Sequence, residues 1–372
     1  MSNKESFKVG IVIGEHSGDR LGSKIIQSLS KEYNISIVGV GGPLTEALGL
    51  KSIFNFKHLH VMGLIEPLLN IRKLLKHQKK LIKIFKDEKI DFFIGVDSPD
   101  FNLPIHKALK KTQNTKNIQL VSPSVWGWRQ GRIKNIKKYI DLTLCLFKFE
   151  HEFYQSYGAR SFLVGHPLSE IFIPYKEDIQ KKYFLPDNKI YIAVLPGSRN
   201  SEITNMMPTY LKTMKTLNEK NKNFHFLIPA ADDVLKKKIE SYIPSEITIT
   251  IGVGNARDFL ALSDFSIVTS GTASLEAAIL GSAPIICYKT NNFNYFIISR
   301  MLKTKLVGLP NLLLSREAFP ELIQDKCNEE NISIALDSLM KSSDLKSVFD
   351  ELHSHLYGNG FDEAAKEILD LN

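Results

Sequence analysis

Residues 7–19 read FKVGIVIGEHSGD, and this stretch predicts the kind of fold that the whole chain adopts. Its first part, Phe7 to Ile13, is an apolar and β-branched run, which is typical of a buried strand. Its second part, Gly14 to Asp19, is a short polar turn that leads into a helical segment expected to begin near Leu21. A strand, a tight turn and a helix in this order open a βαβ unit.

The same rhythm continues along the chain, because short β-branched runs alternate with longer segments of helical periodicity. The clearest further strands are Ile35 to Val40, Phe92 to Val96, Ile118 to Val121, Leu142 to Leu146, Ile190 to Leu195, Phe224 to Ile228, Ile247 to Ile251, Phe265 to Val268 and Pro284 to Cys287. Prolines and charged residues break the rhythm between Gly165 and Asn188. We therefore predict an N-terminal α/β domain over 1–170, a C-terminal α/β domain over 171–345 and a C-terminal helical segment over 346–372, whose packing the sequence leaves open.

The composition is that of an ordinary soluble globular protein, with 43% hydrophobic and 24% charged residues. The formal net charge of +8 suits nucleic acid, an anionic membrane surface or a phosphorylated substrate equally well. The lysines are scattered and no nucleic-acid-binding module is recognisable, so we expect no nucleic-acid partner. Cys145, Cys287 and Cys327 lie far apart in or beside apolar runs, which indicates reduced thiols and a cytoplasmic protein. The polar N-terminus and the lack of a long apolar stretch favour a chain that is neither secreted nor membrane-spanning.

The loops that follow strands are the places to look for function, because ligands of open parallel sheets bind beyond the carboxyl ends of the strands. The turn from Gly14 to Asp19 is neither a P-loop nor a dinucleotide fingerprint; it fits a capped turn or a glycine loop that admits a sugar or phosphate. Asp97 follows its strand directly and is a candidate general base, with an ordinary strand-end carboxylate as the equal alternative. Asp100 is better explained as the cap of the next helix.

Two strand-to-helix loops in the second half favour anion binding. At each of them free N–H groups, the helix dipole and nearby hydroxyl or guanidinium groups suit a diphosphate. A plain capped helix is the simpler alternative for the second loop, where a glutamate is placed for ribose hydroxyls. The residues concerned are Gly197, Ser198 and Arg199 in the first loop and Gly271, Thr272 and Glu276 in the second.

Trp126 and Trp128 follow another strand, close to Arg129, and they fit core packing as well as the lining of an apolar substrate channel. Metal-ligand spacing is missing, because His58 and His60 have no third ligand nearby and no D-x-D is present. We therefore expect no metal site.

Taken in order, these segments resemble those of the lipid A disaccharide synthases, a family of inverting glycosyltransferases with the two-Rossmann-domain GT-B fold. The resemblance is collinear over nearly the whole chain and fades beyond about residue 340. Its motifs are Gly14 to Asp19, Gly41 to Pro43, Val61 to Leu64, Asp97 to Asn102, Ser122 to Trp126, Trp128 to Gln130, Gly165 to Leu168, Leu195 to Arg199, Ser270 to Ala273, Leu309 to Leu312 and Pro320 to Gln324. Each motif alone is weak, whereas the ordered set is very specific. His16, Gly127 and Lys148 depart from the family pattern, and none of them is assigned to the chemistry.

The resemblance implies an α/β fold of two Rossmann-like domains with the active site in the cleft between them. It implies transfer of 2,3-diacylglucosamine from UDP-2,3-diacylglucosamine to 2,3-diacylglucosamine 1-phosphate, giving a β-1,6-linked disaccharide and UDP without a metal ion or cofactor. Asp97 would be the general base. The implied donor-side residues are Gly197, Ser198, Arg199, Gly271, Thr272, Glu276, Asn311, Glu321 and Gln324, and the implied acceptor-side residues are Glu15, Ser17, Gly18, Asp19, Met62, Trp126 and Arg129.

Both implied substrates carry acyl chains, so we expect peripheral binding to an anionic membrane surface, on the inner face of the inner membrane. An apolar stripe at helical spacing starts at Leu64, and the basic residues for this contact lie beside it. They are Arg72, Lys73, Lys76, Lys79, Lys80, Lys83 and Lys86. A homo-oligomer is compatible with the sequence. The alternatives are another GT-B enzyme that acts on UDP-GlcNAc, either an epimerase or a peptidoglycan glycosyltransferase, and a basic nucleic-acid-binding protein.

Overall fold

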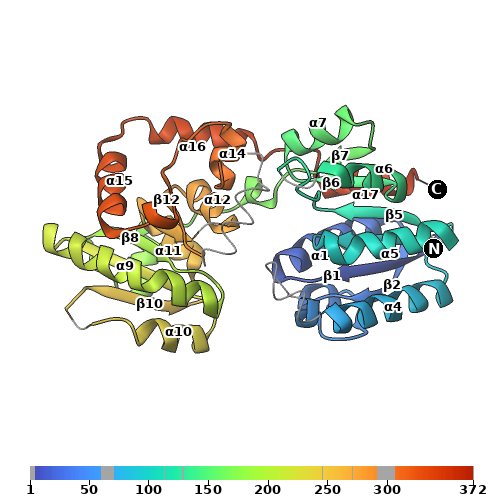
Figure 1. The fold of residues 1–372 in the computed structure, drawn as a ribbon, viewed down its shortest axis with the longest axis horizontal. Helices are drawn as coiled ribbons and strands as arrows, with labels where there is room; N and C mark the ends of the chain where they lie inside the picture. Colours follow the sequence, from blue (N-terminus) through green and yellow to red (C-terminus); the bar gives the residue numbers. More distant parts are fainter. Residues whose placement is uncertain are drawn as a thin grey trace. The chain divides into compact units, whose positions relative to one another are not determined.

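The computed structural model describes residues 5–59, 71–112, 114–127, 130–244, 246–269, 271–290 and 306–371, without the side chain of Lys57. The contacts divide the chain into two compact units, both drawn in Figure 1. Unit 1 comprises Met1–His166 and Leu356–Asn372, and unit 2 comprises Pro167–His355. Each unit is built on a parallel sheet with helices, which confirms the predicted α/β class.

Unit 1 has, among the described residues, a seven-stranded sheet in the order β3-β2-β1-β4-β5-β6-β7, and all its strand pairs are parallel. Its strands are β1 (Ser6–Ile13), β2 (Asn34–Val40), β3 (Lys51–Ser52), β4 (Phe92–Val96), β5 (Lys116–Leu120), β6 (Leu142–Cys145) and β7 (Ser161–Leu163). The short β3 and β7 were not predicted. The strand order runs outward in both directions from the β1–β4 pair, so the topological switch point lies between these two strands.

The helices of unit 1 cover both faces of its sheet. Ile11 and Ile13 of β1 face Gly22 of α1, whereas Val12 between them packs in a buried cluster with Phe85 of α4. Successive strand residues point to opposite faces, so α1 and α4 lie on different sides of the sheet. The helices are α1 (His16–Glu32), α2 (Pro43–Glu46), α4 (Ile71–Asp87), α5 (Pro99–Thr112), α6 (Ile133–Tyr139), α7 (Lys148–Ser156) and α17 (Gly360–Leu369), with 3-10 turns η1 (Phe56–Leu59) and η2 (Gln130–Arg132).

The chain leaves unit 1 after His166 and returns at Leu356. The leaving and returning segments lie side by side, because the His166 N–H donates to the Leu356 carbonyl at 2.8 Å and the Gly360 N–H donates to the Val164 carbonyl at 2.9 Å. The return ends in α17, which packs against α1. The tail whose packing the sequence left open is therefore divided, since α16 (Leu345–Ser354) belongs to unit 2 and α17 to unit 1.

Unit 2 has, within the part of it that is described, a six-stranded parallel sheet in the order β10-β9-β8-β11-β12-β13. Its strands are β8 (Ile190–Leu195), β9 (Phe224–Ala230), β10 (Ile249–Val253), β11 (Phe265–Thr269), β12 (Ala283–Tyr288) and β13 (Glu321–Ile323). All except β13 were predicted, with ends shifted by a few residues. Here the order runs outward from the β8–β11 pair, which places the switch point between β8 and β11.

The helices of unit 2 bury their apolar sides against this sheet. Phe259 and Leu260 of α11 pack with Tyr191 of β8 and Leu227 of β9 in one buried cluster. The helices are α8 (Lys176–Tyr183), α9 (Asn200–Lys220), α10 (Asp233–Glu240), α11 (Ala256–Leu262), α12 (Thr272–Ile279), α14 (Leu309–Leu314), α15 (Glu329–Lys341) and α16, with 3-10 turns η3 (Pro167–Glu170) and η4 (Gln324–Lys326). In the described parts of both units, no helix has the length and apolar character needed to cross a membrane.

Candidate active site

Two carboxylates lie at the switch point of the unit 1 sheet. Ile13 pairs with Val96 at the carboxyl ends of β1 and β4, and Glu15 and Asp97 follow these strand ends. Asp97 is half-buried, and burial raises the pKa of its carboxyl above the ordinary value, with the nearby Glu15 carboxylate adding to the rise. A raised carboxyl pKa brings Asp97 closer to the range that suits a general base near neutral pH.

The turn that carries Asp97 has an unusual backbone. Asp97 has φ +50° and Ser98 has φ +41°, and Val121, which follows the neighbouring strand β5, has φ +67°. Side-chain-bearing residues rarely adopt this left-handed region, and each such residue costs on the order of 1–3 kcal/mol. Hydrogen bonds hold the turn, because the Asp97 carbonyl accepts from Asn102 Nδ2 at 2.8 Å and the Asp97 N–H donates to the Leu120 carbonyl at 2.9 Å.

The cap role predicted for Asp100 is wrong. Helix α5 begins at Pro99, so Asp100 lies inside its first turn, and its carboxylate pairs with the Arg132 guanidinium. An acidic residue in the first turn of a helix is still favourable, because it faces the positive end of the helix dipole. The Asp100 side chain is 66% exposed, which fits a surface ion pair.

The structure shows how the turn after β1 is built. Helix α1 begins at His16 rather than near Leu21, so Ser17, Gly18 and Asp19 lie in its first turn. Ser17 is exposed, whereas Asp19 is only 1% exposed. The Asp19 carboxylate accepts hydrogen bonds from the N–H groups of Gly42, Leu44 and Thr45 and from the Thr45 hydroxyl. Asp19 thus anchors the start of α2, and its oxygens are used inside the protein.

Trp126, another predicted acceptor-side residue, is half-buried and stands edge-on to Phe149, with ring centroids 4.9 Å apart. Beside it Glu150 is buried at the start of α7, where its Oε2 accepts from the Phe147 N–H at 3.3 Å. Burial raises the pKa of Glu150 to about 7. Met62 and Arg129, together with the motif residues 61–64 and 128, lie outside the described residues, so their placement stays a prediction.

The first predicted anion loop lies at the switch point of unit 2, between β8 and α9. Gly197 has φ +115°, and a Cβ there would lie 2.5 Å from the Glu202 side chain, so glycine is required. Glu202 Oε2 accepts from the Ser198 N–H at 2.9 Å, and Glu202 Oε1 lies 2.6 Å from Arg199 Nη1. Glu202 was not among the predicted site residues. Its position three residues after Arg199, which is the N-cap residue of α9, is the sequence signal of such a contact.

The second anion loop follows β11 on the other side of the same switch point. Gly271 has φ +154°, and α12 begins at Thr272; both residues are exposed, whereas Ser270 lies outside the described residues. Glu276 of α12 is half-buried, and its Oε1 lies 2.6 Å from Nε of Arg257 in α11. Sequence reasoning missed Arg257, because the pair joins two helices across 19 positions of the chain. One Glu276 oxygen faces this arginine, which orients the carboxylate.

Asn311, Glu321 and Gln324 have their side chains engaged within unit 2. Asn311 is fully buried, with Nδ2 2.8 Å from Glu321 Oε1 and 2.7 Å from the Phe319 carbonyl. Glu321 also accepts from the N–H groups of Val307 and Gly308. Through these contacts Asn311 and Glu321 hold the backbone of Val307, Gly308 and Phe319 in place. Gln324 makes a matched pair of bonds with Thr290, whose N–H donates to Oε1 at 2.7 Å and whose carbonyl accepts from Nε2 at 3.0 Å.

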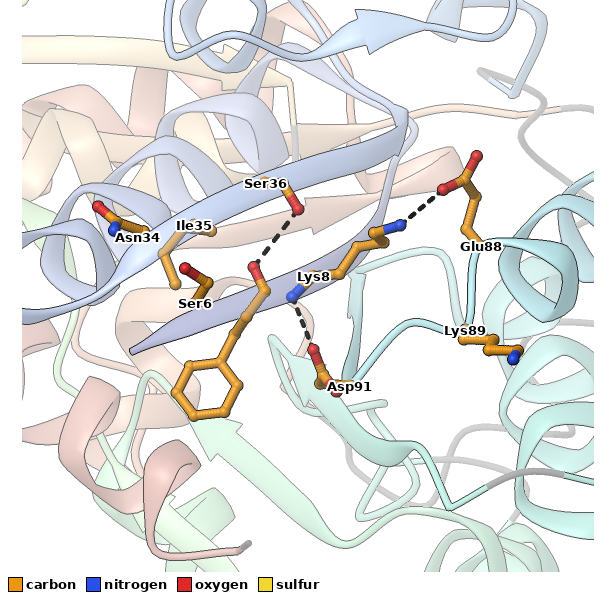
Figure 2. Close-up of a pocket in the computed structure, with 9 residues that line it drawn as sticks. Ser6, Lys8, Asn34, Ile35, Ser36, Glu88, Lys89 and Asp91 are labelled. Carbon is orange, nitrogen blue, oxygen red and sulfur yellow. Dashed lines mark hydrogen bonds and ion pairs between the residues drawn. The ribbon is translucent and has the colours of Figure 1, made fainter. Parts of the chain in front are cut away.

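A shallow pocket of unit 1 lies at the opposite end of the sheet from Glu15 and Asp97, where β1 and β2 begin. Figure 2 shows Lys8 between Glu88 and Asp91, where its Nζ donates to Glu88 Oε2 at 2.8 Å and its backbone N–H donates to Asp91 Oδ2 at 2.7 Å. None of the predicted site residues that the structure describes lines this pocket. Among the described side chains, no cluster of three or more His, Cys, Asp or Glu is arranged to hold a metal ion.

Comparison with known proteins places this geometry in context. The family described as "Lipid-A-disaccharide synthetase" matches residues 9–365. The lipid-A-disaccharide synthase of Idiomarina loihiensis is 38% identical over 375 residues, which cover 98% of each chain.

Among solved structures, the S. aureus protein MnaA in its co-structure with UDP superposes with a TM-score of 0.63 at 13% identity, over 98% of this chain and 95% of that one. A glycosyltransferase from Rickettsia africae superposes with a TM-score of 0.59 at 14% identity, over 99% of both chains. At such identities the two structures bear on the fold alone.

Proposed function

Because the chain belongs to the lipid-A-disaccharide synthase family, we propose that it uses the strand-end residues of its two units for that family's reaction. The protein transfers 2,3-diacylglucosamine from UDP-2,3-diacylglucosamine to 2,3-diacylglucosamine 1-phosphate and releases UDP. The fold is the GT-B fold of two Rossmann-like units, and each unit supplies residues for the proposed reaction. The alternative activities, on UDP-GlcNAc or on nucleic acid, are not favoured, since the family match covers residues 9–365 and the similarity to the solved structures is one of fold only.

The observation that carries this proposal is the position of Asp97. Its carboxylate stands at the switch point of unit 1 on a left-handed turn that hydrogen bonds fix, and burial raises its pKa. In the proposed reaction Asp97 accepts the proton of the acceptor 6-hydroxyl while that oxygen forms its bond to the anomeric carbon of the donor. The bond from this carbon to the diphosphate oxygen breaks on the opposite side, and UDP leaves with the bonding electrons. A single displacement of this kind inverts the anomeric configuration.

Unit 2 supplies the groups for the departing UDP. The first-turn N–H groups of α9 and α12 flank the switch point, and the Arg199 guanidinium, which Glu202 holds through Nη1, adds further N–H donors beside them. These donors stabilise the negative charge that grows on the leaving diphosphate, so the proposed reaction needs no metal ion. Glu276, oriented by Arg257, holds the ribose hydroxyls. Asn311, Glu321 and Gln324 support the surrounding backbone of the donor side.

The proposed site of action is the cytoplasmic face of the inner membrane, to which the protein binds peripherally. Helix α4 supports this proposal, because Arg72, Lys73, Lys76, Lys79, Lys80 and Lys83 are exposed on it together with Ile71 and Leu75. Basic residues attract anionic headgroups, and exposed apolar residues can enter the headgroup region.

The deciding experiment incubates the protein with both acylated sugars in the presence of EDTA and follows UDP and the disaccharide. We expect equimolar amounts of both products, and a β-linkage by NMR. UDP-GlcNAc alone serves as the control substrate, which is expected to yield neither an epimer nor UDP. Product that forms only after a divalent cation is added would contradict the metal-independent mechanism.

A further inference from the structure

Two neighbouring turns of unit 1 share one strained feature. The turn after β4 carries Asp97, and the turn after β5 carries Val121 and leads to Trp126. Both turns place residues with side chains in the left-handed region, which is a particular cost for the β-branched Val121. Such conformations persist only where the surrounding structure fixes them, and they cluster at functional sites.

The group that reaches both turns is the side-chain amide of Gln119, which is fully buried in β5. Its Nε2 lies 3.0 Å from the Asp97 carbonyl oxygen and 3.3 Å from each of the carbonyl oxygens of Leu120 and Val121. A primary amide has two hydrogens, so the three carbonyls share them. The Gln119 side chain thereby links the turn that carries Asp97 to the turn that carries Val121.

His106 of α5 fixes which way this amide points. His106 is fully buried, and its Nε2 lies 3.1 Å from Gln119 Oε1. Burial lowers the pKa of His106 to about 4, so the imidazole is neutral near pH 7 and carries one N–H. Because the amide oxygen can only accept, that proton lies on Nε2. The neutral tautomer therefore holds the Gln119 amino group toward the two turns.

Gly95 of β4 makes room for this arrangement. A Cβ at Gly95 would lie 3.0 Å from Gln119 Oε1 and 3.0 Å from the Asn102 Cβ, which is closer than such contacts usually are. Asn102 is itself fully buried, and its Nδ2 donates to the same Asp97 carbonyl. Two buried amides from different elements thus converge on one carbonyl oxygen across a glycine.

We propose that Gln119, oriented by His106, is a positioning residue for the transfer reaction. It holds the Asp97 carboxylate and the turn that leads to Trp126 in the positions that the reaction needs. This inference rests on the proposed function, because it assigns a purpose to the geometry of the proposed base. Neither side chain touches the reacting atoms. The effect acts through the backbone, where a misplacement of about 1 Å at a reacting group costs roughly a hundredfold in rate.

The first test replaces Gln119 by Met, which keeps the volume and removes the amide. We expect kcat to fall by roughly 30- to 100-fold, with UDP affinity unchanged within about twofold because the donor groups belong to unit 2. In an Asp97→Asn background the same replacement should cost less than about twofold, since the base that Gln119 positions is already lost. The control is Leu109→Ala, a fully buried residue of α5 that packs in the core cluster with Val12 and Phe85. It should lower the melting temperature and leave kcat per folded molecule near the wild-type value.

A second pair of variants keeps the inference testable if Gln119→Met does not fold. His106→Gln retains an N–H donor near the position of Nε2, whereas His106→Leu removes it. We expect His106→Gln to keep most of the turnover and His106→Leu to lose about tenfold in kcat with little change in KM. A purely structural role of His106 would make the two variants equally active per folded molecule, and that result would overturn the inference.

The pH profile supplies a readout that general destabilisation would not move. The acid limb of kcat/KM reports the proposed base, whose pKa is raised by burial. When the turn loosens, water reaches Asp97, its pKa falls toward the ordinary value, and the limb should move to lower pH in Gln119→Met or His106→Leu. If both variants fold and keep the wild-type kcat and limb while Asp97→Asn is inactive, the positioning role is overturned and the base assignment stands. If Asp97→Asn itself keeps turnover, the base assignment is wrong and the positioning inference falls with it.

Discussion

At the scale of single residues, the site combines carboxylates with contrasting surroundings. The Asp19 carboxylate accepts four hydrogen bonds and holds the start of α2 in place. Asp100 lies on the surface against Arg132. Burial raises the pKa of Asp97, and the neighbouring Glu15 carboxylate adds to the rise. Environment rather than residue type therefore separates the proposed base from its neighbours.

Asp97→Asn should lower turnover by about 10²- to 10⁴-fold, because asparagine keeps the shape and cannot accept the proton. The matched variant is Asp100→Asn, three positions later, which loses a surface ion pair with Arg132 and should keep most of the activity. Single-turnover rates, UDP affinity and melting temperature are measured for both. An inactive but folded Asp100→Asn, with an active Asp97→Asn, would reverse the assignment.

The Arg257–Glu276 pair is expected to act on recognition of the ribose. Glu276→Ala should weaken UDP binding roughly tenfold and abolish the preference for UDP over 2′-deoxy-UDP, because a charge-assisted contact to the hydroxyls is lost. Arg257→Ala should weaken UDP about threefold, since it frees the Glu276 carboxylate to turn away. Lys176→Ala, which breaks the ion pair with Asp264 elsewhere in unit 2, is the calorimetric control and should not change UDP affinity. Equal affinities for the two nucleotides in the wild-type protein would contradict the role of Glu276.

At the scale of elements, the long strands and helices follow directly from hydrophobic periodicity. The strands β3, β7 and β13 have two or three residues each, which is too short for a period of two to be visible. The start of α1 was placed too late because His16 and Ser17 are weak helix formers that belong to its first turn. The contact of Glu202 is local, and its spacing from Arg199 is visible in the sequence, whereas the contacts of Arg257 and Gln119 depend on which elements become neighbours. Strand-end motifs therefore located the candidate site, whereas its supporting contacts required the structure.

Helix α7 begins with a buried acid that should make stability depend on pH. Glu150 has its pKa raised to about 7 by burial, whereas an unfolded chain keeps it near 4.5. Between these values the folded state holds a proton that the unfolded state has lost, so this residue's contribution to the free energy of unfolding falls as the pH rises from about 4.5 through 7. Glu150→Gln removes the penalty and should stabilise the protein at pH 8 by up to about 3 kcal/mol, with little effect at pH 4.5. Denaturant unfolding at both pH values measures this, and a gain independent of pH would contradict it.

Helix α4 is expected to carry much of the affinity for anionic bilayers. Replacing Lys76, Lys79 and Lys83 by Gln should weaken binding to vesicles with anionic lipid by about two orders of magnitude, at roughly 1 kcal/mol for each basic residue. The control removes the same charge from unit 2, at the exposed Lys212, Lys215 and Lys220 of α9. Sedimentation at low salt compares the two triple variants. Equal losses in both would show that net charge, and not α4, drives the binding.

At the scale of the whole molecule, unit 2 is contiguous in sequence, whereas unit 1 is completed by the last helix of the chain. Ala364, Ala365 and Ile368 of α17 are buried in unit 1, and Asp362 pairs with Lys31 of α1 at 2.7 Å. The stability of unit 1 therefore depends on residues that are distant in sequence from its other elements.

A chain that ends at Asn359 lacks α17 and should unfold in two steps, with unit 1 melting first. The loss should exceed the roughly 2–5 kcal/mol expected for Ile368→Ala alone, because the whole buried face of α17 is removed. UDP affinity should persist below the second transition, since the donor groups lie in unit 2. Lys366→Ala, which removes an exposed ion pair within α17, is the control and should melt like the wild type. A single transition at the wild-type temperature would contradict the role of α17.

The interrupted connectivity of unit 1 also has a consequence for biosynthesis. Strands β1 to β7 of unit 1 leave the ribosome well before α17 does, and the whole of unit 2 emerges in between. Because synthesis proceeds at about 5–20 residues per second, the side of α1 that binds α17 stays exposed for on the order of tens of seconds. During this interval unit 2 can already fold, although it is second in sequence. Nascent chains stalled so that the part outside the ribosome ends just before Gly360 should therefore contain a protease-resistant unit 2 and a unit 1 that is still cleaved and still bound by chaperones.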